Sequence, residues 1–199
     1  MQFAESQLDL PGIRDVPEAV ARVAGHARSL ASCAVDHVAL CVEAANFPGY
    51  LHQVRQQLPA STVSECCIGD PDSGMRIAEV LDPGSGVHLV LAAPTGSRGQ
   101  LVEFLDTTGA EGLQHVAFIV PVVQAAVLEL AGRGVPFVGG TEAPERAIVE
   151  AREGDSCLRQ AFTEPLFGAF FIELIERRGI VDLRRRNIDA LYALKAQSA

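Results

Sequence analysis

The sequence predicts an α+β fold made of two copies of one β-α-β-β-β module. Two strand-like stretches, VDHVALCV at 35–42 and LQHVAFIV at 113–120, resemble each other, and each has a histidine at its centre. A helix-like segment and further strand-like segments follow each stretch, so the same order of elements occurs twice. The repeat is long for a solenoid unit, and it favours a duplicated module whose copies pair across a shared cleft.

Hydrophobic periodicity places the remaining elements. In the first copy we expect one helix and three further strands, at 47–58, 62–68, 75–81 and 86–92. In the second copy we expect a helix at 122–134 and strands at 135–139, at either 146–151 or 157–163, and at 169–176. Gly132 and Gly134 mark the end of the second helix.

The predicted organisation has five segments along the chain. Asp15 can cap a helix from about Val16 to Leu30, with Pro17 in its first turn. The segments are an N-terminal helical extension (1–32), the first module (33–97), a linker helix (98–112), the second module (113–178) and a C-terminal lid helix (179–199).

Composition excludes several classes of protein. The chain has 199 residues, 48% of them hydrophobic and 21% charged, which is typical of a globular domain. Its net charge of −9 argues against nucleic acid as a partner. No stretch approaches the roughly 20 apolar residues that span a bilayer, and no secretory signal is visible. Five cysteines without framework spacing indicate a reduced, cytoplasmic protein.

Two histidines and one glutamate are the candidate chemical groups. Alternate side chains of a strand share a face, so His37 and His115 point with small and apolar neighbours toward an interior. Glu173 shares its strand face with Phe171 and Ile175, where a carboxylate is costly unless it is paired or bound to metal. Two imidazoles and one carboxylate are the ligand set that leaves open positions on non-haem Fe(II). Three separate core residues are the alternative reading.

Four stretches carry a resemblance to a known family: VDHVAL, SRGQLVEFLDTTGAEGLQHVAF, LRQAFTEP and FFIELIERRG. Over about residues 34–195 the chain resembles the vicinal-oxygen-chelate superfamily, and within it the catalytic domain of 4-hydroxyphenylpyruvate dioxygenase and hydroxymandelate synthase. The resemblance implies paired modules that form an open, curved sheet around a metal site. It implies that His37, His115 and Glu173 are catalytic ligands of Fe(II), and that the substrates are a 2-oxo acid and O₂.

The resemblance also implies a substrate pocket. Its expected residues are Gln100, Gln114, Gln160, Phe162, Phe171, Ile77, Ala92 and Ile188. Two polar positions of the family are occupied here by Ile77 and Ala92, and an aromatic position of the lid helix is occupied by Ile188. These differences predict a substrate with a less polar tail than 4-hydroxyphenylpyruvate.

Other functions within this superfamily stay open. An isomerase or lyase of the glyoxalase–epimerase type needs a fourth protein ligand at or near Val90, and valine cannot bind metal, although His88 shares its strand face. Ring-cleaving dioxygenases need a further histidine and a tyrosine near the metal, but His52, Tyr50 and Tyr192 fall in helix-like segments. A metal-free small-molecule binding protein of this fold typically loses the three ligands, which are kept here.

Two further expectations concern surfaces. The run RRGIVDLRRR, with Arg177, Arg178 and 184–186, is read as a solvated helix entry rather than a site that steers an anionic substrate. Family chains usually carry a further N-terminal half, where this sequence has the segment 1–32. The remaining apolar surface should be covered by the N-terminal helix or by a second copy of the chain, and we expect a homodimer.

Overall fold

The computed structural model describes residues 33–84, 86–140, 143–166 and 168–179. The helix expected at 16–30 and the C-terminal lid helix lie outside these residues. The described chain divides into two compact units, one of residues 39–114 and the other of residues 33–38 with 115–179. Strands β1 (Val35–Cys41) and β5 (Gly112–Ile119) contribute residues to both units.

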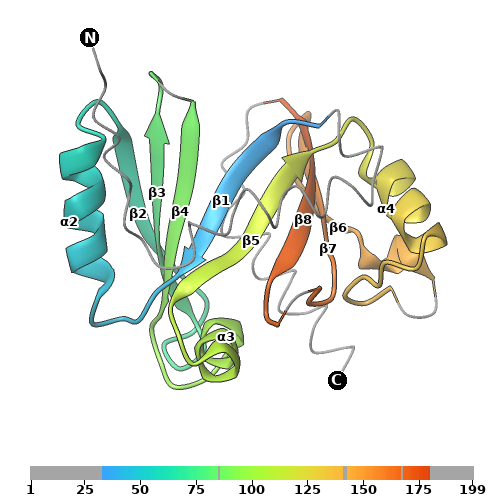
Figure 1. The fold of residues 1–199 in the computed structure, drawn as a ribbon. Coiled ribbons are helices and arrows are strands. Elements are labelled where there is room, and N and C mark those ends of the chain that lie inside the picture. Colours follow the sequence, from blue (N-terminus) through green and yellow to red (C-terminus); the bar gives the residue numbers. More distant parts are fainter. Residues whose placement is uncertain (1–32, 85, 141–142, 167, 180–199) are drawn as a thin grey trace, which may run out of the picture. The chain divides into compact units, whose positions relative to one another are not determined.

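The first unit contains a sheet, in which β3 pairs antiparallel with both β2 and β4, and two helices (Figure 1). Its strands follow the order β2-β3-β4-β1. Helix α2 packs against β4, and its buried residues Phe47, Leu51 and Val54 recur at helical spacing. The further elements of this unit are α2 (Phe47–Gln57), β2 (Thr62–Ile68), β3 (Met75–Asp82), β4 (Val87–Pro94) and α3 (Gln100–Thr108).

The second unit positions the candidate site. Its strands follow the order β1-β5-β8-β7-β6, and β8 pairs in parallel with β5 and antiparallel with β7. Helix α4 packs against β7 and β8 through the face that carries Val123, Val127 and Leu130, all buried (Figure 1). The further elements are α4 (Val123–Gly132), the 3-10 helix η2 (Pro144–Ala147), β6 (Val149–Glu153), β7 (Ser156–Phe162) and β8 (Phe171–Arg178).

The predicted fold class is confirmed, because β1-α2-β2-β3-β4 is followed by β5-α4-β6-β7-β8. The strand expected at 135–139 is wrong: this segment forms only a single bridge, from Phe137 to Thr163. Pro136 has no N–H to donate, and Gly139 turns the backbone with a φ of 73°. Both alternatives for the next strand form instead, as β6 and β7, and the tight turn between them contains Gly154 with a φ of 56°.

Two expectations from composition, on membrane spans and on disulfides, can be compared with the described chain. Its helices lack the combination of length and hydropathy that a bilayer-spanning helix needs. The five cysteines all lie within the described residues, and none of the five forms a disulfide there.

Candidate metal centre

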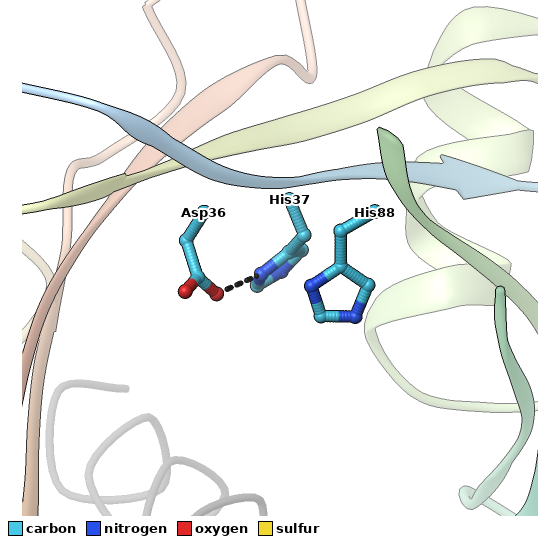
Figure 2. Close-up of side chains that lie close together, drawn as sticks. All are labelled: Asp36, His37 and His88. Carbon is cyan, nitrogen blue, oxygen red and sulfur yellow. Dashed lines mark hydrogen bonds and ion pairs between the residues drawn. The ribbon is translucent and has the colours of Figure 1, made fainter. Parts of the chain in front are cut away.

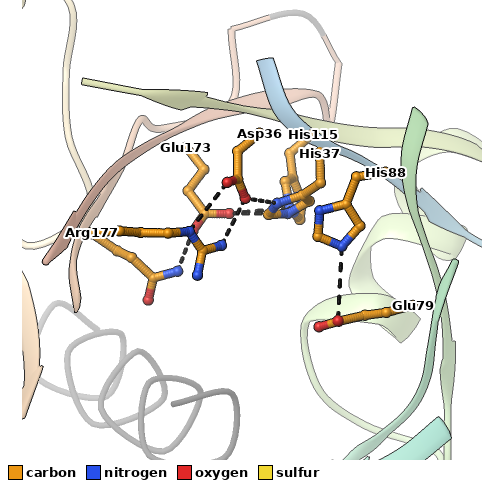
Figure 3. A network of polar contacts seen from close by, with 8 residues as sticks. Asp36, His37, Glu79, His88, His115, Glu173 and Arg177 are labelled. Carbon is orange, nitrogen blue, oxygen red and sulfur yellow. Dashed lines mark hydrogen bonds and ion pairs between the residues drawn. The ribbon is translucent and has the colours of Figure 1, made fainter. Parts of the chain in front are cut away.

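Three side chains from three neighbouring strands converge in the second unit (Figure 3). His37 comes from β1, His115 from β5 and Glu173 from β8. The two imidazole Nε2 atoms lie 3.2 Å apart. Glu173 Oε2 lies 3.5 Å from Nε2 of His37 and 3.3 Å from Nε2 of His115. The side chains are 12%, 14% and 4% exposed in the order His37, His115 and Glu173, so the cluster is almost closed to bulk water.

Strand pairing explains why these residues meet. In the parallel pair of β5 and β8, His115 lies opposite Phe171, and Ala117 lies opposite Glu173. Because alternate side chains of a strand share a face, Phe171 and Glu173 point the same way from β8. The sheet thus brings a carboxylate beside the imidazole of the adjacent strand.

The spacing of the three donor atoms fits a divalent cation. An ion bound by imidazole nitrogen and carboxylate oxygen lies about 2.1 Å from each donor. With donors at that distance from the ion, two neighbouring donors lie about 3.0 Å apart in an octahedral arrangement and about 3.4 Å apart in a tetrahedral one. The separations of 3.2 to 3.5 Å match this range. The described residues His37, His115 and Glu173 also form one of the two groups of side chains whose donor atoms are close enough to hold a metal ion.

Glu173 and His115 are each held by a second side chain. Gln160 donates a short hydrogen bond from its amide nitrogen to Glu173 Oε1, so that Oε2 is left to face the histidines. The amide oxygen of Gln160 is buried and has no hydrogen-bond partner among the described residues. Phe171 stacks on the ring of His115 with centroids 4.8 Å apart, and Phe162 lies edge-on to Phe171 at 6.3 Å.

His37 is held by two residues that the sequence reasoning missed. Its Nδ1 donates a hydrogen bond of 2.9 Å to Asp36 Oδ2 (Figure 2). Arg177 in turn donates to both oxygens of Asp36, at 3.2 and 2.8 Å (Figure 3). The arginine was expected in a solvated helix entry. Arg177 and Arg178 are exposed, as expected, but the helix entry is wrong for them, because they lie on β8. They form ion pairs with Asp36 and Glu176 respectively.

Burial and charge shape the protonation of the cluster. Burial opposes charge on His37, but its hydrogen bond to Asp36 and the negative charge of Glu173 outweigh burial and raise its pKa. Burial lowers the pKa of His115. Burial would raise the pKa of Glu173, but the hydrogen bond from His115 and the charge of His37 hold it below its ordinary value. Likewise, hydrogen bonds from His37 and Arg177 overcome burial and hold the pKa of Asp36 well below its usual range.

Solved structures resemble the chain over most of its length. A mutant of 4-hydroxymandelate synthase from Streptomyces coelicolor has a TM-score of 0.71 at 28% identity, covering 83% of this chain and 53% of that one. Methylmalonyl-CoA epimerase from Mycobacterium tuberculosis has a TM-score of 0.54 at 26% identity, covering 77% and 93%. The chain has the vicinal-oxygen-chelate fold. The resemblance expected from the sequence is therefore confirmed.

Curated relatives of the chain include proteins named 4-hydroxyphenylpyruvate dioxygenase and 4-hydroxyphenylpyruvate dioxygenase-like protein. The 4-hydroxyphenylpyruvate dioxygenase-like protein of Rattus norvegicus is 27% identical over 198 residues, covering 79% of this chain and 53% of the relative. The 4-hydroxyphenylpyruvate dioxygenase of Pseudomonas aeruginosa is 26% identical over 141 residues, covering 60% and 40%. The chain thus spans about half the length of the curated relatives that it matches. No protein-family model matches the sequence.

The remaining predicted pocket residues are placed as follows in the described chain. Ile77 and Ala92 are buried cross-strand partners on β3 and β4 of the first unit. Gln100 begins α3, and Gln114 is a buried residue of β5. The structure brings Gln160, Phe162 and Phe171 together around Glu173 and His115 in the second unit. Ile188 lies outside the described residues.

Two residues weighed for rival functions have polar contacts within the first unit. His88 Nε2 lies 3.8 Å from a carboxylate oxygen of Glu79 (Figure 3). The Tyr50 hydroxyl donates a hydrogen bond of 2.6 Å to Glu111. This contact engages the phenol of Tyr50 in a local hydrogen bond and gives no support to the ring-cleavage reading.

Proposed function

We propose that this chain is a non-haem Fe(II) dioxygenase that acts on a 2-oxo acid. The observation that carries the proposal is the convergence of His37, His115 and Glu173, with donor atoms 3.2 to 3.5 Å apart. The relatives named dioxygenase support the reaction class. Because the chain covers about half of those relatives, their activity is carried over here as a proposal only.

The three side chains would hold the ion and leave part of its coordination sphere open. When bound, Fe(II) supplies activation of O₂ for oxidative decarboxylation of a 2-oxo acid and hydroxylation of the same molecule. One carboxylate and two neutral imidazoles carry a charge of −1, so a divalent ion leaves the site net positive and attractive to an anionic acid. Phe162 and Phe171 form an apolar wall that excludes water from this side of the site. Gln160 fixes Glu173 through its amide nitrogen.

The substrate we propose is a 2-oxo acid with an unhydroxylated phenyl or a branched aliphatic tail. The family resemblance assigns Ile77 and Ala92 to the pocket in place of two polar residues, and both are buried apolar side chains. A site without hydrogen-bonding groups for a phenol gains no binding free energy from its hydroxyl group. It also has to remove that hydroxyl group from water, which costs free energy. The proposal is therefore that 4-hydroxyphenylpyruvate is a poorer substrate than phenylpyruvate.

A second candidate is a metal-dependent isomerase or lyase. It is favoured by the structural likeness to methylmalonyl-CoA epimerase, whose chain is covered to 93%. Against it stands the residue at the expected fourth ligand position, Val90, which offers no donor atom. A metal-free binding protein is a weaker candidate, since all three donor side chains are kept and face one another.

Oxygen uptake measured together with CO₂ release tests the proposed reaction. Protein loaded anaerobically with Fe(II) is mixed with a panel of 2-oxo acids, and one O₂ should be consumed for each CO₂ released. The variant Glu173→Gln keeps the shape of the side chain but loses its charge, and it should lose the coupled signal. If iron-loaded protein consumes no O₂ with any acid of the panel, the dioxygenase proposal is wrong and the isomerase or lyase takes its place.

We also propose that the protein is a homodimer. Several large apolar side chains of the second unit are more than a third exposed, namely Val35, Ile119, Val122 and Leu128. A second copy that covered such residues would remove their apolar area from water. Light scattering at micromolar concentration should give twice the mass of the chain, and a monomer mass would contradict the proposal.

A further inference from the structure

The contacts of Asp36 link the candidate metal centre to an arginine on another strand. Asp36 Oδ2 accepts from His37 Nδ1 at 2.9 Å. The guanidinium of Arg177 donates from Nε to Oδ1 at 3.2 Å and from Nη2 to Oδ2 at 2.8 Å. This is a two-point contact, the geometry in which arginine recognises a carboxylate most specifically. All three residues belong to the second unit.

The first consequence of this chain of contacts concerns the tautomer of His37. A carboxylate only accepts hydrogen bonds, and both Asp36 oxygens already face N–H donors of Arg177. The proton of a neutral His37 imidazole therefore belongs on Nδ1, which faces Asp36. Nε2 is then the unprotonated nitrogen, and it is Nε2 that faces His115 and Glu173.

The second consequence concerns the direction of the ring. An imidazole held only by its Cα–Cβ and Cβ–Cγ torsions can rotate, and Nε2 would then leave the cluster. The Asp36 carboxylate fixes one edge of the ring, and its own position is fixed by Arg177 from β8. The side chain of Asp36 is 9% exposed and that of Arg177 is 39% exposed, so the arginine shields the inner bond from water.

We propose that Asp36 and Arg177 are a positioning pair for His37, in which Asp36 fixes the Nδ1–H tautomer and Arg177 fixes Asp36. The proposal rests on the metal site of the proposed function, and it assigns roles to two residues outside the ligand set. His115 is held differently, because its ring is stacked on Phe171. Substitutions that remove the charge of Asp36 or Arg177 should therefore affect the ring of His37 but not that of His115.

Co(II) titration is the first test, with Co(II) as an air-stable probe whose visible absorption reports its ligands. Removal of a partner that orients a metal-binding histidine typically weakens metal affinity by about 10–100-fold. We expect a loss of this size for Asp36→Asn and a smaller loss for Arg177→Gln. The double variant should bind about as weakly as Asp36→Asn alone, because Arg177 acts through Asp36.

Matched controls come from the next ion pair along β8. Glu176, with its side chain 4% exposed against 9% for Asp36, is also shielded from water and accepts from the exposed Arg178, but it does not touch His37. Glu176→Gln and Arg178→Gln should change the Co(II) dissociation constant by less than about twofold, whatever they do to the melting temperature of the metal-free protein. If Asp36→Asn weakens Co(II) binding no more than Glu176→Gln does, the positioning role is wrong.

Nitrogen NMR of the metal-free protein is the second test, and it does not depend on metal binding. In the parent protein, with the imidazoles neutral, His37 should show a protonated Nδ1 and an unprotonated Nε2. In Asp36→Asn it should show a mixture of tautomers, while His115 is unchanged. A His37 that keeps the pure Nδ1–H form in Asp36→Asn overturns the pair. A parent protein that binds no Co(II) overturns the proposed function instead, so the two failures are distinguishable.

Discussion

The Nε2 atoms of His37 and His115 lie 3.2 Å apart, although the two residues are separated by 78 positions in the chain. If both imidazoles are neutral, the lone pair of one Nε2 faces either the lone pair or the N–H group of the other, in surroundings that exclude water. The carboxylate of Glu173 completes the group from a third strand. A cation between the donor atoms would stabilise such a cluster. The first test therefore measures whether the protein holds a metal ion and whether each donor is needed for it.

The metal content of the purified protein should depend on each of the three donors. Protein prepared anaerobically should hold about one Fe(II) per chain, and His37→Ala, His115→Ala and Glu173→Ala should each remove it, because two remaining donors bind the ion too weakly. Elemental analysis after gel filtration gives the ratio of metal to protein. His52→Ala is the control, since His52 is an exposed residue of α2. Full metal in all three donor variants would refute the site.

Competition between substrates should reveal the apolar character of the pocket. Phenylpyruvate, 4-methyl-2-oxovalerate and 4-hydroxyphenylpyruvate are offered together to iron-loaded protein, and the consumption of each is followed by chromatography. We expect the two acids without a hydroxyl to be consumed first. A tenfold preference for 4-hydroxyphenylpyruvate, equal to about 1.4 kcal/mol in transition-state binding, would contradict the assignment of Ile77 and Ala92 as pocket residues.

The phenol of Tyr50 should titrate at unusually high pH. Its hydrogen bond to Glu111 raises the pKa of Tyr50 to about 12, because the bond favours the neutral phenol. The bond therefore stabilises the fold fully below the ordinary tyrosine pKa of about 10, and this contribution disappears as the pH rises toward 12. Phenolate absorbance should show a high step that Tyr50→Phe removes and Glu111→Gln moves to lower pH. A titration of the parent protein with every tyrosine near 10 would disprove the shift.

Glu176 should stabilise the fold without affecting the metal site. Its carboxylate accepts from the backbone N–H of Val123, the first residue of α4, at 3.0 Å and from Arg178 at 2.9 Å. Glu176→Ala leaves a buried N–H without its charged acceptor, and we expect a loss of about 1.5–3 kcal/mol in the free energy of unfolding. Urea unfolding measures it. Arg178→Gln, at an exposed position, should cost less than about 1 kcal/mol. Equal losses in the two variants would contradict this role.

Much of the fold could be predicted because β1, β5 and β8 are short runs rich in apolar residues. The histidines and the glutamate interrupt otherwise apolar strand faces, which is why they could be found from the sequence. The error at 135–139 has a local cause: Phe137 and Val138 are buried like strand residues, but Pro136 and Gly139 prevent a continuous ladder.

The positioning residues could not be predicted by the same reasoning. Alternation places Asp36 on the opposite face of β1 from His37, so the pattern gives no sign that their side chains meet. Arg177 was grouped with other arginines by sequence proximity, whereas its partner lies 141 positions away. The one available signal was the spacing of four residues between Glu173 and Arg177, which puts both on the same face of β8.

Strand β8 lies between β5 and β7, and its pairing register decides whether the carboxylate of Glu173 faces the two histidines. Glu173 lies opposite Ala117 on one side and Phe162 on the other. A slip of β8 by one residue would turn the fully buried Leu174 toward the histidines and send the carboxylate of Glu173 into the core that Leu174 now fills. A chain folded in that register would bury the unpaired charge of Glu173 and would also lose the carboxylate donor of the proposed metal site. Occupancy of the proposed site would therefore distinguish correctly paired molecules from misaligned ones, and the ion would act as a check on folding.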